Sequence, residues 1–191
     1  MRSMSAHAIA TARLRLAPVR PEELRELHAL LADETVRRYL CDGRDLGAPR
    51  IAETIESSIA TFETHGLGLW AARLEGETRI SGLVGYAEFA DPGVLEIMYA
   101  MFERCWGRGL ASEMTRAVME RGYARGLDEL HASTDAPNEA SVRVLERLGF
   151  VEVRRAPADP PHTLWEQVYF LHRPREKTLD SGRAARHIGS E

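Results

Sequence analysis

Two glycines just past the middle of the chain are the first residues whose types and spacing could do chemistry. Residues 104–114 read RCWGRGLASEM, with Gly107 and Gly109 directly before a helix-like run over residues 110–126. A helix N-terminus presents unpaired N–H groups and a partial positive charge, and glycine lets a ligand approach the backbone closely. The junction therefore predicts a site for phosphate or pyrophosphate. A tight turn with no ligand is the alternative.

Three phosphate-binding motifs bear on this junction. The P-loop pattern G-x-x-x-x-G-K-[ST] is absent from the chain. The dinucleotide pattern G-x-G-x-x-G/A is nearly matched by GRGLAS, but Ser112 takes the third place and the junction does not follow the first strand. The pattern R/Q-x-x-G-x-G/A is matched by Arg104, Gly107 and Gly109. The second pattern keeps a nucleotide-dependent oxidoreductase open as an alternative.

A single carboxylate interrupts the apolar run before the junction. In VLEIMYAM, Glu96 shares one face of a strand with Met98 and Ala100. A carboxylate between apolar neighbours is costly to bury, and burial moves its pKa upward, toward the range of a general base. Glu96 is therefore the candidate base, and Glu88 is the reserve candidate. The alternative is a glutamate that faces solvent or pairs with an arginine.

Strands and helices of mixed order must position these residues. Alternation and turn signals predict strands over 11–18, 67–74, 79–89, 94–102, 129–134, 151–154 and 164–172. Helical spacing predicts helices over 21–32, 51–65, 110–126 and 135–150, the last with Asp135 as N-cap and Gly149 as its stop, and the stretch 33–48 reads as a loop. The strand–helix–strand unit over 94–134 requires one parallel pair in a largely antiparallel sheet.

Length and composition set the outer limits. A chain of 191 residues suits one domain, which we expect over residues 11–172, with a flexible N-terminus over 1–10 and a polar tail over 173–191. The net charge of −4 gives no support for a nucleic-acid partner. No apolar run is long enough to span a membrane. Cys41 and Cys105 are too few for a disulfide framework, so a reduced cytoplasmic compartment is expected. The spacing of the cysteines and histidines predicts no metal site.

Together these motifs resemble the GCN5-related N-acetyltransferases (GNAT), specifically the RimJ/RimL-like subgroup. The resemblance covers about residues 11–172 and rests on RCWGRGLASEM together with TARLRL, LWAAR, GLVGYAEF, LEIMYAM and NEASVRVLERLGF. The specific feature is the pattern N-x-x-S-x-x-x-L-x-x-x-G-F, which begins at Asn138, 31 residues after Gly107. The resemblance implies an α+β (mixed α/β) fold with a central, largely antiparallel sheet of about seven strands flanked by about four helices.

The resemblance also implies that acetyl-CoA is a cosubstrate and that no metal is needed. The pyrophosphate would lie on backbone amides of the junction, and the pantetheine would pair with the preceding strand. The cofactor-binding residues expected on this basis are Ala100, Met101, Arg104, Gly107, Arg108, Gly109, Leu110, Ala111, Asn138 and Ser141. For Asn138 and Ser141 the alternative is a plain role in capping and filling the first turn of the helix over 135–150.

The implied reaction is direct attack of an amine on the thioester in a ternary complex. Glu96 would be the base, and the amides around Ala100 and Met101 would stabilise the thioester oxygen. Many members carry a tyrosine where this chain has Leu145, so the acid to the leaving thiolate is open, with Ser141 and Tyr99 as possible donors. The acceptor would be a protein N-terminal amine or a small amine. Segments 33–66 and 155–165 would line its binding site. A homodimer fits the subgroup.

Other readings remain beside this one. The missing tyrosine leaves room for a non-catalytic acyl-CoA-binding module. Cys105 could be a nucleophile, but direct transfer needs none. His131 reads as structural or as a wall of the acceptor pocket, and Trp70 reads as a core residue. Trp106 could shield the cofactor or make a dimer contact.

Overall fold

The computed structural model describes residues 4–40, 42–88, 93–160 and 163–174. Cys41, His162 and the predicted tail from residue 175 onward therefore lie outside the described residues. The strands are β1 (Ile9–Ala10), β2 (Leu14–Pro18), β3 (Leu69–Leu74), β4 (Gly82–Glu88), β5 (Leu95–Met101), β6 (Leu130–Asp135), β7 (Val151–Ala156) and β8 (Gln167–His172). The α-helices are α1 (Leu24–Leu31), α2 (Glu34–Leu40), α3 (Gly47–His65), α4 (Leu110–Ala124) and α5 (Glu139–Leu148). Three 3₁₀ turns are η1 (Met4–His7), η2 (Pro21–Glu23) and η3 (Glu103–Cys105).

The strands form one sheet in the order β1-β2-β3-β4-β5-β6-β8-β7. Every neighbouring pair is antiparallel except β5 and β6, which are parallel because α4 carries the chain back between them. The predicted α+β fold with a mixed, largely antiparallel sheet is confirmed. The sheet has eight strands and five α-helices lie beside it in the described residues, against the about seven and about four expected.

The additional helix is α2, in the stretch that the sequence predicted as a loop. Asp33 starts it, because its Oδ1 accepts hydrogen bonds from the Thr35 amide at 3.0 Å and the Thr35 hydroxyl at 2.5 Å. Val36 is buried in an apolar cluster with residues of α1, α3 and the sheet. The loop prediction for 33–48 was therefore wrong over 34–40, since a capped helix of two turns carries too little periodic signal to be seen.

The additional strand is β1, in the segment that the sequence predicted as flexible. Its residues pair antiparallel with β2, Ile9 with Leu16 and Ala10 with Arg15. Just before it, the His7 carbonyl accepts a hydrogen bond from the Trp70 indole N–H at 2.8 Å. The described residues after Ser5 are thus tied to the sheet, because a buried indole N–H needs an acceptor and this segment supplies it.

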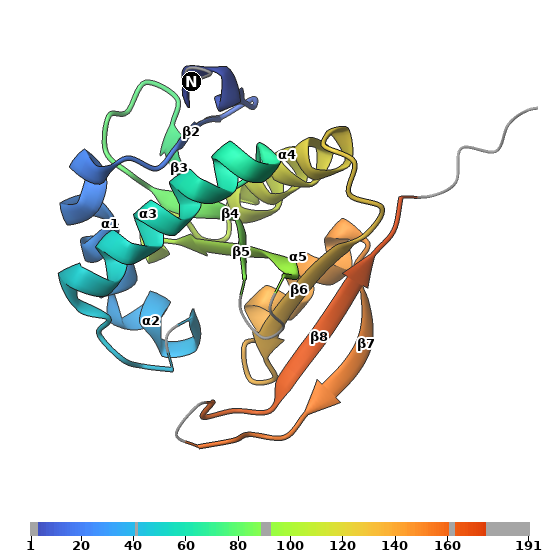
Figure 1. Ribbon diagram of the computed structural model, residues 1–191. Helices are drawn as coiled ribbons and strands as arrows, with labels where there is room; N and C mark the ends of the chain where they lie inside the picture. The colour runs from blue at the N-terminus through green and yellow to red at the C-terminus, as the bar shows by residue number, and fades with distance from the viewer. Residues whose placement is uncertain (1–3, 41, 89–92, 161–162, 175–191) are drawn as a thin grey trace, which may run out of the picture.

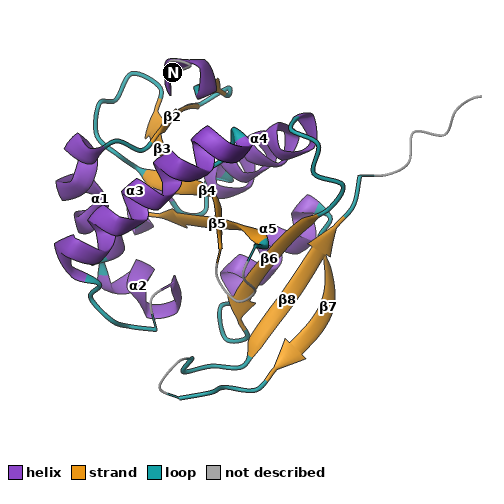
Figure 2. Cartoon of the chain, viewed as in Figure 1, coloured by secondary structure: helices purple, strands orange, loops and turns teal. Residues whose placement is uncertain are grey.

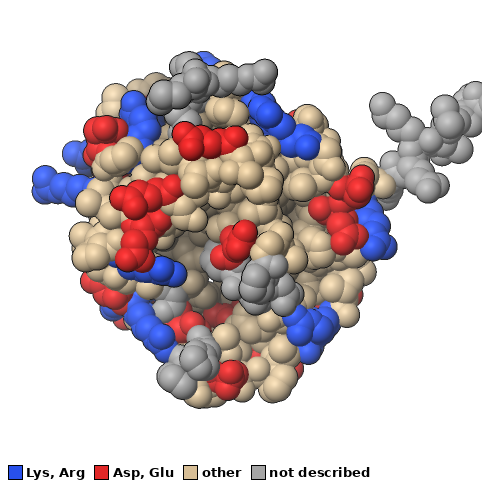
Figure 3. Space-filling model, viewed as in Figure 1, with Lys and Arg blue, Asp and Glu red and all other residues tan. Residues whose placement is uncertain are grey.

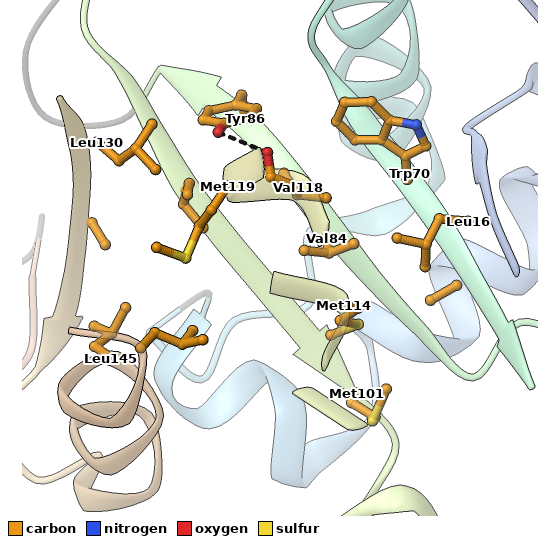
Figure 4. Packing of buried hydrophobic residues seen from close by; sticks show 14 of the residues in the cluster. Leu16, Trp70, Val84, Tyr86, Met101, Met114, Val118, Met119, Leu130 and Leu145 are labelled. Atoms are coloured by element: carbon orange, nitrogen blue, oxygen red, sulfur yellow. Dashed lines mark hydrogen bonds between the residues drawn. The ribbon is translucent and has the colours of Figure 1, made fainter. Parts of the chain in front are cut away.

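Helices cover both faces of the sheet (Figures 1 and 2). On one face α4 and α5 pack through Met114, Val118 and Leu145 against apolar strand residues such as Val84 (Figure 4). On the other face α1, α2 and α3 enclose a second apolar cluster around Leu30 and Ile55. Trp70 is 0% exposed and lies in the core, as predicted. Both faces of the central strands are therefore dry, which fixes their position.

Candidate active site

The parallel pair β5–β6 is the break in the sheet that makes a site. The two strands pair at one position only, Glu96 with His131, near the start of each strand. Beyond it they diverge, β5 continuing along β4 while β6 turns away with β8 (Figure 2). The far half of β5 therefore has a neighbour on one side and an open edge on the other.

The direction of the β5 backbone decides which amides reach that open edge. The Phe102 amide donates to the Ser81 carbonyl, toward β4, at 3.1 Å. Because backbone groups alternate sides along a strand, Ala100 also turns toward β4, opposite Leu83. Tyr99 and Met101 then direct their N–H groups to the open edge. From the sequence, the amides around Ala100 and Met101 were expected to be the donors to the thioester oxygen. The strand geometry directs the Ala100 amide to β4, so the amides at the open edge are those of Tyr99 and Met101.

A cavity of about 960 Å³ fills the opening between the two strands. Its walls come from α2, β5, the glycine junction, β6, α5 and β8. The expected cofactor residues that line it are Ala100, Met101, Gly107, Gly109, Leu110, Ala111, Asn138 and Ser141, and Glu96 lines it too. Tertiary folding therefore brings together in one space most of the residues that the sequence singled out.

The glycine junction has the backbone that a ligand loop needs. Gly107 and Gly109 have φ of +70° and +73°, a region that side chains other than glycine rarely adopt. Gly109 is the N-cap of α4 and carries no side chain that would occupy the amides of the first turn. A Cβ at Gly107 would meet no atom within 4 Å, so the space over it is open. No contact with the rest of the protein demands glycine at this position, but its positive φ does.

Arg104 and Arg108 differ from the glycines. The Arg104 guanidinium donates to the Ile80 carbonyl at 3.2 Å and lies 4.4 Å from the centre of the Phe102 ring. Neither arginine side chain lines the cavity. Both were expected to bind the cofactor, and the Arg104 guanidinium is already engaged by the Ile80 carbonyl and the Phe102 ring.

A network at the N-terminus of α4 holds the junction, and no local pattern in the sequence predicted it. Glu113 accepts hydrogen bonds from the Thr11 hydroxyl at 2.6 Å and from the Arg13 amide at 2.9 Å, and it forms an ion pair with the Arg13 guanidinium at 2.6 Å. Arg13 also donates to the Arg108 carbonyl at 2.9 Å. Burial acts to raise the pKa of the Glu113 carboxyl, but these partners lower it overall. The start of the sheet is thus tied to the glycine junction.

Glu96 is 4% exposed and lines the cavity. Its Oε2 accepts a hydrogen bond from the Ser133 hydroxyl of β6 at 2.6 Å. It shares its face of β5 with Met98 and Ala100, which pack toward the α1 and α3 cluster, as strand alternation predicted. Glu88, the reserve candidate, is exposed and does not line the cavity. Glu96 is therefore the carboxylate that the fold places in the cavity on β5.

Two hydroxyls meet on the other face of β5. The Tyr99 hydroxyl lies 2.7 Å from Ser141 Oγ and donates to the Ser141 carbonyl at 3.1 Å. Burial raises the pKa of Tyr99 to about 12. Leu145, one turn further along α5, is 1% exposed in the core. A tyrosine from β5 thus supplies a hydroxyl near Ser141 where α5 itself has none at Leu145.

Asn138 is the N-cap of α5, since its Oδ1 accepts from the Ser141 amide at 3.2 Å. The sequence assigned this cap to Asp135, and that was wrong because the helix starts at Glu139. Asp135 instead ends β6 and faces the cavity, 4% exposed. Gly149 ends α5 in the left-handed conformation, as predicted.

The acceptor-side segments line the cavity only in part. From 33–66, α2 and the residues after it contribute Thr35, Tyr39 and Asp42, whereas α3 contributes none; from 155–165, Thr163 contributes. Gln167 and Tyr169 of β8 line the cavity as well, and the sequence did not single them out. Only the strand register identifies these two residues, because it places Gln167 opposite Asp135 and Tyr169 opposite Ser133.

Other reactive side chains have ordinary surroundings. Cys105 is buried and borders the cavity next to the glycine junction. His131 pairs with Glu129 at 3.0 Å, outside the cavity lining. The Trp106 indole donates to the Met101 carbonyl at 2.7 Å, which braces the end of β5.

Two features are absent from the described residues. They contain no group of three or more His, Cys, Asp or Glu arranged to hold a metal ion. Within the same residues no helix combines the length and apolarity that crossing a bilayer requires.

Comparison with known proteins completes the description of the site. Residues 13–151 match the sequence model described as "Acetyltransferase (GNAT) domain". Two curated relatives come from Bacillus subtilis (strain 168). One, "Uncharacterized protein YkkB", is 29% identical over 145 residues, covering 74% of this chain and 83% of the relative. The other, "Uncharacterized N-acetyltransferase YoaA", is 28% identical over 149 residues, covering 73% and 80%.

Solved structures share the fold at lower identity. A RimL ribosomal L7/L12 alpha-N-protein acetyltransferase in complex with coenzyme A has a TM-score of 0.73 and 16% identity, covering 87% of this chain and 97% of that one. At this identity the likeness concerns the fold.

Proposed function

The chain belongs to the GNAT family of acetyltransferases, and from this premise we propose that it transfers acetyl from acetyl-CoA to a primary amine by direct attack in a ternary complex. The observation that carries the proposal is the single cavity that joins an open strand edge, a glycine helix N-terminus and a buried carboxylate. We propose residues 11–172 as the acetyltransferase domain; β1, at residues 9 and 10, precedes these bounds and pairs with β2.

Acetyl-CoA would bind along the open edge of β5. Its pyrophosphate fits the amides of the junction, where α4 begins with glycine and the helix dipole favours negative charge. Its pantetheine carbonyls fit the Tyr99 and Met101 N–H groups that face the open edge, as an added strand would. The thioester would then lie near Glu96, where β5 and β6 come together.

Glu96 would take the proton from the acceptor amine, directly or through a water. The Ser133 hydroxyl orients its carboxylate by donating to Oε2. A neutral amine can then attack the thioester carbon, forming the C–N bond. The Tyr99 or Met101 N–H would stabilise the oxygen as it becomes anionic.

Ser141 would hydrogen-bond the departing sulfur as the C–S bond breaks. Because burial raises the pKa of Tyr99 to about 12, its hydroxyl keeps its proton at neutral pH and can hold Ser141 Oγ. A thiol with an ordinary pKa near 8–9 leaves tolerably as a thiolate, so a hydrogen bond suffices in place of a full acid.

The acceptor amine, from a protein N-terminus or a small molecule, would enter from the side of α2 and β8. The similar RimL structure is that of a ribosomal L7/L12 alpha-N-protein acetyltransferase, which makes a protein N-terminus one candidate here. The antiparallel sheet argues against the oxidoreductase alternative, because the dinucleotide fingerprint belongs to a parallel, doubly wound sheet.

Thermal unfolding with acetyl-CoA, with CoA and with NAD(P) tests the proposal. Ligand at about 100 times its dissociation constant adds roughly 2.7 kcal/mol, which raises the midpoint of a domain this size by roughly 5–10 °C. We expect that shift with both forms of CoA and none with NAD(P), followed by free-thiol release when an amine is added. No shift with either form of CoA would overturn the proposal.

A further inference from the structure

The acceptor half of the cavity carries an excess of carboxylates. Asp42, Glu96 and Asp135 line it, together with hydroxyl, phenol and amide groups. The guanidinium groups in the lining are Arg143 and Arg147, and both lie on α5. In the space-filling view, Asp and Glu atoms lie in the hollow between α2 and β8 (Figure 3). The negative charge thus faces the side from which the amine would enter.

Asp135 is the unusual member of this group. It is 4% exposed, its Oδ1 accepts a hydrogen bond from Gln167 Nε2, and its Oδ2 is buried without a hydrogen-bond partner in the described structure. A buried carboxylate oxygen without a donor is costly, and native proteins rarely keep one that nothing binds. A ligand could supply the hydrogen-bond donor that Asp135 Oδ2 lacks.

A second carboxylate adds to the cost. The Asp42 carboxylate is close enough to act on Asp135: burial raises the pKa of Asp135 to about 6, and Asp42 adds to the rise against the hydrogen bond from Gln167. Asp42 accepts a hydrogen bond from the Leu164 amide at 3.1 Å, which fixes it at the same end of the cavity. Two carboxylates at one end of the cavity favour a positively charged ligand.

The spacing along β6 relates this pair to Glu96. Ser133, whose hydroxyl touches Glu96, and Asp135 are two residues apart on one face of β6. Two residues of strand span about 7 Å. An extended four-carbon diamine covers this distance, with one nitrogen near Glu96 and the other near Asp135.

We propose that Asp135, with Asp42, binds a second positive charge on the acceptor, so that the preferred acceptor is a primary amine carrying another cationic group a few bonds away. The inference deepens the proposed acetyl transfer and rests on it. Asp135 then determines which acceptor is preferred, and Glu96 accepts the proton of the nitrogen that reacts.

A matched set of three amines tests the charge directly. Putrescine, butylamine and γ-aminobutyrate share a primary amine on a four-carbon chain and end in a positive, a neutral and a negative group. We would measure their binding to the full chain loaded with CoA by calorimetry, and their acetylation with acetyl-CoA by thiol release. We expect affinity and kcat/KM to fall in that order, by about tenfold or more from putrescine to butylamine, the change that one such contact contributes.

The variant Asp135→Asn should remove the preference. Asparagine keeps an oxygen for Gln167, so we expect putrescine to lose about tenfold in affinity while butylamine changes by less than about threefold. Asp42→Asn is the second variant, since asparagine tolerates the positive φ of 51° at this position. Asp159→Asn, an exposed residue outside the cavity lining, controls for net charge and should change neither amine.

The outcomes separate the inference from the proposed function. Equal binding of the three amines, or a putrescine preference that survives Asp135→Asn and Asp42→Asn, would overturn the inference even if acetylation proceeds. A charge order in binding without any acetylation would uphold the cation site and overturn acetyl transfer.

Discussion

Glu96 is the residue that separates an enzyme from a binding module. If it is the base, Glu96→Gln should lower turnover by roughly 100-fold or more and leave acetyl-CoA affinity similar, because the amide cannot accept the proton but keeps an oxygen for Ser133. Turnover is followed by thiol release across pH and affinity by calorimetry.

Glu88→Gln is the matched control, since Glu88 ends the neighbouring strand outside the cavity. Similar losses in both variants, or unchanged turnover in Glu96→Gln across the pH range, would remove Glu96 from the role of base. Acetyl-CoA binding with no turnover in the parent chain would favour the non-catalytic module, which the buried Leu145 keeps open.

Asp135 also predicts a pH-dependent difference in stability. Its pKa is about 6 when folded, against an unperturbed value of 3.8. Because the folded value is the higher one, its stability contribution is present below about pH 4 and is lost as pH rises through about 6, a change on the order of 3 kcal/mol. Asp135→Asn does not titrate, so we expect it to be more stable than the parent at pH 7–8, with the difference shrinking toward pH 4.

Urea unfolding of both chains in an amine-free buffer at several pH values measures this difference. A variant that is less stable at neutral pH, or an advantage that grows as the pH falls, would contradict the expectation. The expected result would mean that the folded chain keeps a carboxylate that destabilises it, as binding sites often do.

At the scale of elements, the junction between β5 and α4 holds the proposed pyrophosphate site. Gly109→Val should weaken acetyl-CoA binding by at least about tenfold, since a branched side chain would cover the first amides of α4 and strain a φ of +73°. Calorimetric titration with acetyl-CoA measures the loss.

Gly76→Val separates the two effects. Gly76 has a φ of +81° in an exposed turn, and a Cβ there would meet nothing within 4 Å, so this variant carries the same backbone strain away from the cavity. We expect it to lose stability but keep acetyl-CoA affinity. Wild-type affinity in a folded Gly109→Val would refute the loop assignment.

At the scale of the whole molecule, one sheet forms the centre. Its two halves, β1–β5 and β6–β8, meet at one parallel pair of strands. α4 and α5 pack on one face across this meeting point, and α2 contacts both halves from the other. The opening is therefore held by helices on two sides, and a ligand along β5 would add contacts to both halves. This is the physical reason to expect a large thermal shift with acetyl-CoA.

Truncation tests which ends belong to the domain. Deleting residues 1–8 should lower the unfolding free energy by about 1–3 kcal/mol, because it removes the acceptor of the buried Trp70 N–H. Deleting residues 175–191, which we propose lie outside the domain, should leave stability and the acetyl-CoA shift unchanged. Thermal unfolding of both shortened chains gives the answer. Unchanged stability after the first deletion would contradict the role given to the His7 carbonyl, and a destabilised second deletion would extend the domain beyond residue 172.

The sequence by itself determined the local features of this protein. The turns, the periodicity and the strand–glycine–helix junction predicted the order of elements and the mixed sheet, and alternation placed Glu96 on its face of β5. These succeed because each depends on neighbours within a few residues along the chain. The resemblance to the GNAT family rests on the same kind of local motif, and the match over residues 13–151 confirms it.

Tertiary structure alone decided what lies opposite what. Asp135 reads as a helix cap until β6 is seen to end there, beside Gln167 of β8 and near Asp42 of the segment after α2. The ties of Glu113 to Arg13 and of Trp70 to His7 likewise join residues far apart in the chain. No local pattern encodes such pairs, because they form only when packing brings separate elements into contact. The charge of the acceptor pocket, and so the proposed choice of substrate, belongs to this second kind of information.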